Sequence, residues 1–212
     1  MADLSFIHRF EPGGRPALRP LLLLHGTGGD ENDLLSLGRM VAPGAPLLSP
    51  RGKVLEHGMP RFFRRLAEGV FDEEDVRARA HELADFVAAA RAAYGVPEPV
   101  ALGYSNGANI AAAVLLLRPE ALTGAILLRA MVPLANAEAG RALDGKAALI
   151  ASGAQDPIAP PANAARLKAM LEQAGARVDH RILPAGHELT PADVGLAREW
   201  LEGQGASVAA AS

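Results

Sequence analysis

The sequence predicts an α/β fold in which a mainly parallel sheet carries helices on both faces. Three observations support this: short apolar runs recur along the chain, helical patterns separate them, and most of the runs lack polar alternation. Runs that are apolar throughout are typical of strands buried on both faces, as in a parallel sheet. The chain has 212 residues, 50% of them hydrophobic, which predicts a single domain over 1–212.

The expected strands are short and bounded by turn residues. The N-terminal segment 4–10, LSFIHRF, alternates between apolar and polar residues and is expected to be an antiparallel edge strand. The predicted parallel strands occupy 20–26, 45–52, 99–105, 122–130, 146–153 and 177–184.

Helical patterns lie between these runs. Asp30, with Asp33 three residues later, predicts an N-cap for a helix over 30–41. Segment 72–95 is long and amphipathic, begins with acidic residues and ends at Gly95. Further helices are expected over 106–120, 160–175 and 190–203, the last followed by a frayed tail over 203–212.

Segment 51–72 shows no clear element of its own. Long irregular segments in compact domains are often functional. Its residues Met59, Phe62 and Phe63 either pack onto the core or line a pocket, and the sequence leaves both alternatives open. The basic cluster 61–65, RFFRR, could contact an anionic substrate, although a solvated basic face is the expected role.

The composition excludes several classes of site and partner. The chain has no cysteine, which excludes disulfides, thiolate metal sites and a cysteine nucleophile. A net charge of −3 provides no general attraction to nucleic acid or to an anionic membrane. No secretory signal is visible, and the longest apolar stretch is broken by Arg129 and Pro133, so no membrane span is expected. We therefore expect a soluble, cytoplasmic protein.

Residues 103–107 read Gly-Tyr-Ser-Asn-Gly, the G-x-S-x-G pattern of a nucleophile elbow. Neighbours without side chains allow strand and helix to approach closely while the Ser105 hydroxyl projects from a strained turn. The pattern falls between the predicted strand and the predicted helix, where the motif requires it. Ser105 is therefore a candidate nucleophile, and an ordinary serine N-cap is the alternative.

A serine nucleophile needs a base, and that base needs an orienting group. Asp156 follows the predicted strand 146–153, and His187 follows the predicted strand 177–184. With Ser105, both lie at the carboxyl ends of strands, where catalytic groups gather in open α/β sheets. The order Ser, Asp, His is also the order of the elbow-bearing hydrolases. We therefore predict a catalytic triad of Ser105, Asp156 and His187.

Other histidines and aspartates lie in less suitable places. His81 is expected on the exposed face of a helix, His180 inside a strand and Asp144 at the wrong end of the sheet. His25 is expected to hold its own loop, and His57 in the irregular segment could contact a substrate.

Segment 25–29, His-Gly-Thr-Gly-Gly, joins the strand over 20–26 to the following helix. Glycines allow the backbone to point an N–H group at a developing oxyanion, so the N–H groups of Thr27 and Asn106 are predicted to form the oxyanion hole. A phosphate-binding loop is the alternative, but the segment lacks the Lys-Ser/Thr pair of a P-loop and the spacing of G-x-G-x-x-G.

Four motifs, LLLLHGTGGDENDL, GYSNGANIA, SGAQDPI and AGHEL, together resemble the small phospholipase/carboxylesterase group of α/β-hydrolases, which includes acyl-protein thioesterases. The resemblance covers residues 20–202. It implies an α/β-hydrolase fold without a large lid domain, no cofactor, the triad and oxyanion residues named above, and a homodimer.

The sequence also departs from that group's thioesterase branch. Asn106 stands where the branch has glutamine, and HGTGGDE is longer than the usual form of that loop. RAMVPL replaces a small Ser-Gly pair, so Met131 is expected to narrow the acyl pocket.

The expected activity is hydrolysis of small carboxylic esters through an acyl-enzyme. The alternatives are hydrolysis of a thioester, a lactone or a lysophospholipid by the same triad, or a non-catalytic protein that binds a small ligand. The expected partner is a small-molecule ester. The predicted substrate pocket contains Met59, Phe62, Phe63 and Met131.

Overall fold

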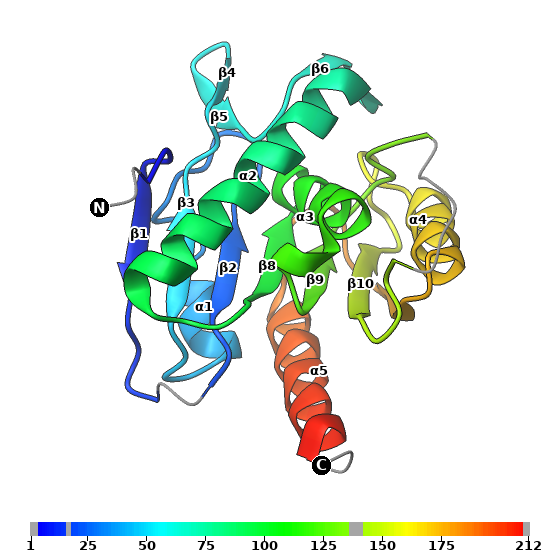
Figure 1. The fold of residues 1–212 in the computed structure, drawn as a ribbon. Coiled ribbons are helices and arrows are strands. Elements are labelled where there is room, and N and C mark those ends of the chain that lie inside the picture. The colour runs from blue at the N-terminus through cyan, green and yellow to red at the C-terminus, as the bar shows by residue number, and fades with distance from the viewer. Residues whose placement is uncertain (1–3, 16–17, 136–141, 210–212) are drawn as a thin grey trace.

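A computed structural model describes residues 4–15, 18–135 and 142–209, with the side chains of 205–209 left aside. Its centre is a seven-stranded sheet of order β1-β3-β2-β8-β9-β10-β11 (Figure 1). β1 pairs antiparallel with β3, and the other pairings are parallel, as the sequence predicts. The strands are β1 (His8–Glu11), β2 (Leu21–Leu24), β3 (Leu47–Pro50), β8 (Val100–Tyr104), β9 (Gly124–Leu128), β10 (Ala147–Gly153) and β11 (Arg177–Leu183).

Helices cover both faces of this sheet (Figure 1). α2, α3 and α4 share one buried apolar cluster with the sheet, and α1 and α5 share a second cluster on the opposite face. No helix in the described ranges is long and apolar enough to cross a membrane. The helices are α1 (Leu35–Val41), α2 (Glu73–Tyr94), α3 (Asn106–Leu117), α4 (Pro161–Gln173) and α5 (Pro191–Ala209), with a 3₁₀ turn at Pro119–Ala121.

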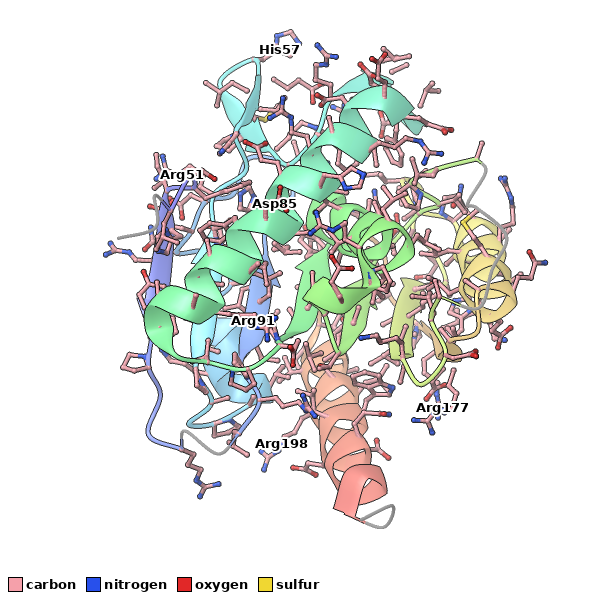
Figure 2. All side chains as sticks on the ribbon, in the orientation of Figure 1. Arg51, His57, Asp85, Arg91, Arg177 and Arg198 are labelled. Carbon is pink, nitrogen blue, oxygen red and sulfur yellow. The ribbon has the colours of Figure 1, made fainter. Side chains whose placement is uncertain are left out.

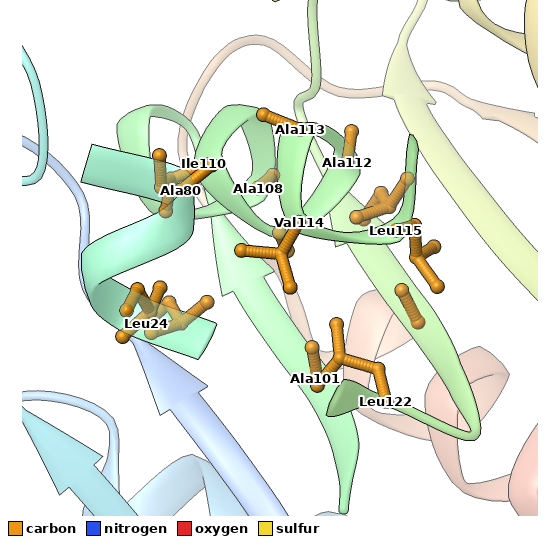
Figure 3. Close-up of a cluster of buried hydrophobic side chains, with 14 of the residues drawn as sticks. Leu24, Ala80, Ala101, Ala108, Ile110, Ala112, Ala113, Val114, Leu115 and Leu122 are labelled. Carbon is orange, nitrogen blue, oxygen red and sulfur yellow. The ribbon is translucent and has the colours of Figure 1, made fainter. Parts of the chain in front are cut away.

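β2 shows why the central strands are apolar throughout. Leu22 and Leu24 belong to the cluster under α2 and α3, whereas Leu21 and Leu23 belong to the cluster under α1 and α5. Successive side chains of a strand point to opposite faces, so a strand covered on both faces needs apolar residues at every position. Figure 3 shows the first cluster, in which small side chains of α3 such as Ala108 and Ala112 lie over the sheet.

The first helix is shorter than predicted. α1 begins at Leu35 with Leu34 at its N-cap position, so the prediction of an Asp30 cap was wrong. Asp30 instead accepts a hydrogen bond from the backbone N of Asn32 at 2.7 Å, which closes a separate turn before the helix. The long helix has its expected ends: the Asp72 carboxylate accepts from Asp75 N, and Gly95 is left-handed with φ 66°.

The prediction that segment 51–72 lacks elements was also wrong. It forms two antiparallel hairpins, β4 (Val54–Glu56) with β5 (Met59–Arg61) and β6 (Arg65–Ala67) with β7 (Val70–Phe71). The first hairpin turns at His57 and Gly58, which have φ of 51° and 81°. Positive φ at both central residues suits the right-handed twist of paired strands. Strands of two or three residues give no periodic signal in the sequence, so the pattern was missed.

Two further differences concern the C-terminal half. β11 is an edge strand whose residues are all exposed or half-buried, not a strand buried on both faces. The backbone of α5 stays helical to Ala209, through most of the segment expected to fray. Residues 210–212 of that predicted tail lie outside the described residues.

Candidate active site

Ser105 lies at the corner between β8 and α3, as predicted, with φ 52° and ψ −114°. A non-glycine residue adopts positive φ only when its surroundings enforce it. The neighbouring glycines allow the corner: a Cβ on Gly103 would lie 2.5 Å from Gly107 O, and a Cβ on Gly107 would lie 1.9 Å from Leu24 O. The strand and the helix therefore meet backbone to backbone, and the serine side chain projects from the turn.

The structure brings the three residues predicted as a triad together. His187 Nε2 lies 3.0 Å from Ser105 Oγ, and His187 Nδ1 lies 2.8 Å from Asp156 Oδ2. The Asp156 side chain is fully buried, and its Oδ1 accepts from the backbone N of Ile158 and Ala159 at 2.8 and 2.9 Å. A carboxylate only accepts hydrogen bonds, so Nδ1 carries the imidazole proton and Nε2 presents its lone pair to the serine hydroxyl.

The loop after β2 lies against this corner. A Cβ on Gly26 would lie 2.8 Å from Cδ1 of Tyr104, so the loop and the elbow are in direct contact. His25 is buried, and its Nε2 accepts from Gly52 N at 2.9 Å while Nδ1 donates to Gly26 O at 2.6 Å. Burial lowers the pKa of His25, which keeps the ring neutral as this pattern requires. His25 therefore holds its loop, as predicted.

The backbone donors around the serine divide into used and free groups. Ser105 N donates to Leu128 O at 2.8 Å, Gly28 N to Pro60 O at 2.9 Å and Gly29 N to Gly26 O at 3.1 Å. The N–H groups of Thr27 and Asn106 make no hydrogen bond within the described part of the chain. Both donors that the sequence predicts for an oxyanion hole are therefore free.

Arg61 supports the Thr27 side of the site, a role that the sequence analysis missed. Its side chain is only 3% exposed, so the expectation of a solvated basic face was wrong for this residue. Nη1 donates to Thr27 Oγ1 at 2.5 Å, and Nε donates to Phe63 O at 3.1 Å and lies 3.3 Å from Glu56 Oε2. Burial, with Arg65 nearby, lowers the pKa of Arg61. The hairpin turns this arginine inward, and short strands hid that direction in the sequence.

Of the four predicted pocket residues, two are packed into the core and two lie beside the loops and the helix around Ser105. Phe62 and Phe63 are buried in the core, Phe62 against His25 and Phe63 edge-on to Phe71 with ring centroids 5.1 Å apart. Their burial supports the packing alternative. Met59 is 40% exposed and lies beside the Thr27 loop, since a Cβ on Gly28 would lie 3.7 Å from its sulfur. Met131 is buried beside the elbow helix, and its N donates to Asn109 Oδ1 at 2.7 Å.

Arg129 is the second functional candidate that the sequence analysis missed. It directly follows β9, has φ 57° and is 1% exposed. Its guanidinium binds Asp193 and two backbone carbonyls of the His187 loop. The signal was a lone charge within the apolar run 124–134, directly after a strand.

Tyr104 also contacts the His187 loop. Its hydroxyl donates to His187 O at 3.1 Å, and the two rings lie 5.5 Å apart. Burial raises the pKa of Tyr104, so the phenol keeps the proton that it donates.

The other histidines have local partners or lie in solvent. His180 Nε2 lies 2.9 Å from Ser152 Oγ, and His8 Nε2 lies 2.7 Å from Tyr94 Oη, so both pair locally. His81 is exposed, as predicted. His57 projects from the outer end of the β4–β5 hairpin (Figure 2), and its contact with a substrate stays a prediction.

Two other features bear on where a ligand could bind. No group of three or more His, Asp or Glu side chains in the described ranges is placed to hold a metal ion. A surface hollow of about 280 Å³ lies where β10 and β11 begin, whereas Ser105, Asp156 and His187 follow the carboxyl ends of their strands. The hollow is therefore separate from the triad. It is lined by Ala147, Arg177, Val178, Asp179, Trp200 and Gln204.

Known proteins resemble this chain over most of its length. No model of a known protein family matches it. "Putative hydrolase MhqD" of Bacillus subtilis (strain 168) is 47% identical over 182 residues, which are 85% of this chain and 90% of that protein. The crystal structure of the Bacillus cereus carboxylesterase matches with a TM-score of 0.91 and 47% identity over 95% of this chain and 96% of that one. A carboxylesterase from Mesorhizobium loti matches with a TM-score of 0.90 and 36% identity over 96% and 97%.

Proposed function

Because this chain belongs to the carboxylesterase family of α/β-hydrolases, we propose that it is a serine carboxylesterase that hydrolyses small esters through an acyl-enzyme. Its mainly parallel sheet with helices on both faces is the α/β-hydrolase fold, and the described residues include no large lid domain. Its relatives support an esterase activity. What we propose beyond that activity is the serine mechanism and the preference for small esters.

One observation carries the proposal: Ser105 Oγ, the His187 ring and the Asp156 carboxylate form a continuous chain of hydrogen bonds of 3.0 and 2.8 Å. That chain begins at a serine held at φ 52°. A structural serine needs neither the strained backbone nor a histidine that is itself oriented by a buried carboxylate.

Acylation follows from these contacts. His187 Nε2 removes the proton from Ser105 Oγ as that oxygen bonds to the ester carbonyl carbon. The buried Asp156 carboxylate stabilises the imidazolium that results and keeps the ring in place. The free N–H groups of Thr27 and Asn106 donate to the carbonyl oxygen as it becomes negative. His187 then gives its proton to the departing alkoxide, and the alcohol leaves.

Deacylation uses the same groups in the opposite sense. His187 Nε2 takes a proton from a water molecule, whose oxygen attacks the acyl carbon bound to Ser105. The Thr27 and Asn106 N–H groups again hold the oxyanion. The acid is released when the bond to Ser105 Oγ breaks and His187 returns the proton to that oxygen. No cofactor takes part in this scheme.

The size of the acyl group depends on the side chains beside the elbow. We assign Met59 and Met131 to the substrate side, since Met59 touches the Thr27 loop and Met131 lies over the elbow helix. Thioester, lactone and lysophospholipid hydrolysis use the same chemistry. A series of p-nitrophenyl esters of increasing chain length, with one thioester and one lactone, separates these substrates. Small esters should have the highest kcat/KM.

Ser105→Ala tests the proposal against a matched control. Ser152→Ala removes a second serine, whose Oγ also lies 2.9 Å from a histidine but which lies within β10 and does not have positive φ. With p-nitrophenyl acetate, Ser105→Ala should lose nearly all activity and Ser152→Ala should keep it. Undiminished activity of Ser105→Ala would refute the serine mechanism, whereas a wild type without activity towards any of the esters would favour a ligand-binding protein.

A cytoplasmic location and a homodimer belong to the same proposal. The absence of cysteines suits a reducing compartment. Sedimentation of the purified chain tests the dimer, which predicts twice the mass of 22.0 kDa.

A further inference from the structure

Arg129 occupies a position that does not suit an ordinary arginine. It follows the carboxyl end of β9 with φ 57°, in the left-handed region that favours glycine. Its side chain is among the largest that are fully buried. An unpaired charge in such a place is costly, so its partners should explain why it is there.

Every N–H of this guanidinium has an acceptor. Nη1 donates to Asp193 Oδ1 at 2.7 Å and to Ala151 O at 3.2 Å. Nη2 donates to Asp193 Oδ2 at 2.9 Å and to Glu188 O at 3.0 Å. Nε donates to Gly186 O at 2.9 Å. Arginine has five such donors, so the group is fully used, and both charged side chains are 0% exposed.

The accepting carbonyls surround His187. Gly186 precedes it and Glu188 follows it, so one guanidinium binds the backbone on both sides of the histidine. The carbonyl of His187 itself accepts from the Tyr104 hydroxyl at 3.1 Å. Three consecutive carbonyls thus receive hydrogen bonds from side chains that belong to β8 and to the end of β9.

We propose that Arg129 is a positioning residue for His187: through Gly186 and Glu188 it fixes the loop so that Nε2 meets Ser105 and Nδ1 meets Asp156. The inference rests on the proposed function, since it concerns the histidine of that triad. Asp193 orients the guanidinium with two parallel bonds and also accepts from Thr190 N and Oγ1 at the start of α5. Lysine cannot replace this arrangement, because it offers a single ammonium in place of a rigid fork.

The loop has reason to depend on these bonds. β11, the strand before it, is a half-exposed edge strand, and the two triad contacts of His187 require both ring nitrogens in place at once. Displacement of a catalytic group by about 1 Å can cost about 10²-fold in rate without weakening substrate binding. Loss of Arg129 should therefore lower kcat more than it changes KM.

The double variant Arg129→Met/Asp193→Asn tests this. It removes both buried charges together, and the asparagine oxygen can still accept from Thr190, so the variant is expected to fold. With p-nitrophenyl acetate, its kcat should fall by about 10²-fold with KM nearly unchanged. The low-field proton NMR signal of His187 Nδ1–H, bonded to Asp156 in the wild type, should broaden or vanish.

Three further variants separate positioning from loss of stability. Leu83→Ala, in the buried core of α2, should lower the melting temperature but keep the kcat and the NMR signal of the wild type. Tyr104→Phe removes only the bond to His187 O and should lower kcat less than the double variant does. Arg129→Lys keeps a cation for Asp193 and should restore stability better than kcat.

A folded double variant with the kcat and the Nδ1–H signal of the wild type would overturn the inference. So would a Leu83→Ala variant that loses kcat in proportion to its stability. Failure of the proposed function gives a different pattern, in which Ser105→Ala remains active. In that case the Nδ1–H signal, which needs no turnover, still decides whether Arg129 positions His187.

Discussion

The two sides of Ser105 are held by different kinds of interaction. On one side, the His187 loop is bound by Arg129 and Asp193, whose side chains are 0% exposed. On the other, the Thr27 loop is bound by Arg61, whose partner Glu56 is 24% exposed and also binds Arg65. Apolar side chains stand in solvent on that second side, on the β4–β5 and β6–β7 hairpins. They are Leu55, Met59, Leu66 and Val70, which are 40% to 73% exposed.

This difference suggests a division of tasks. In the proposed mechanism His187 and Asp156 need one fixed geometry whatever the substrate, and buried, fully paired contacts hold the His187 loop in place. In the proposed function the Thr27 loop and the hairpins face the substrate, and half-exposed contacts there can change at lower cost in stability. Substitutions near His187 should therefore affect folding and catalysis together, whereas those on the hairpins should mainly affect substrate preference.

The largest expected effect is on the buried side. Arg129→Met leaves the Asp193 carboxylate buried without its cation, so the free energy of unfolding should fall by about 3–5 kcal/mol in urea titrations. Arg198→Met is the control on α5: Arg198 is 56% exposed, pairs with Glu202 and lies at the surface in Figure 2. That change should cost about 0.3–0.5 kcal/mol. Similar losses of unfolding free energy in the two variants would show that the buried pair of Arg129 and Asp193 is no more important for stability than a surface pair.

A smaller effect is expected on the hairpin side. Arg61→Met removes the donors to Thr27 Oγ1 and Phe63 O, but Glu56 keeps Arg65, so the loss in unfolding free energy should be about 1–3 kcal/mol. Arg64→Met, in the same cluster but 62% exposed, should change it by less than about 0.5 kcal/mol. If Arg64→Met destabilised the protein as much as Arg61→Met, the burial of Arg61 would not be the reason for the loss of stability.

The neutral, buried state of His25 should make the free energy of unfolding depend on pH. Burial lowers its pKa in the folded state, so below about 6.5 the unfolded chain binds the proton more readily than the folded protein does. Its contribution to stability is therefore complete above about 6.5 and is lost as the pH falls through the lower folded value. His25→Gln should reduce the slope of unfolding free energy against pH by up to about 1.4 kcal/mol per unit.

Part of the slope of unfolding free energy against pH should remain in His25→Gln, because burial also lowers the pKa of His180. An unchanged slope in His25→Gln, measured by urea titration between pH 5 and 7, would contradict the assignment of a neutral, buried ring.

The smallest effect on stability is expected at Met59. Met59→Ala truncates a partly exposed side chain beside Gly28, so the unfolding free energy should change by less than about 0.5 kcal/mol. Loss of apolar contact with the substrate should raise KM for the longer esters by up to about 10-fold with kcat kept. A fall in kcat for all esters alike would place Met59 with the catalytic groups instead.

The succession of strands and helices along the chain and the place of the nucleophile were predictable from the sequence, because each rests on a local pattern. The apolar runs of β2 and β8 through β10 reflect burial on both faces, and Gly103 and Gly107 mark a corner where a Cβ has no room. Asp156 and His187 could be paired with Ser105 because parallel strands end at the same edge of a sheet.

The supports of the site could not be read in this way. Arg61 and Arg129 look like surface charges in the sequence, and only the fold places Thr27 and the His187 loop beside them. The hairpins of 51–72 consist of strands too short for a period, and the turn of the first hairpin uses His57 rather than a typical turn residue before Gly58. Hydrogen bonds between residues far apart in the sequence produce no regular spacing by which they could be recognised.

The most direct test of the account is labelling by a fluorophosphonate, followed by mass spectrometry of the peptides, with His187→Gln as the comparison. The account predicts a label on Ser105 alone in the wild type, and a labelling rate at least about 10²-fold lower in His187→Gln, because the general base is lost. A label on another serine such as Ser152, or an equal rate in the two proteins, would contradict it.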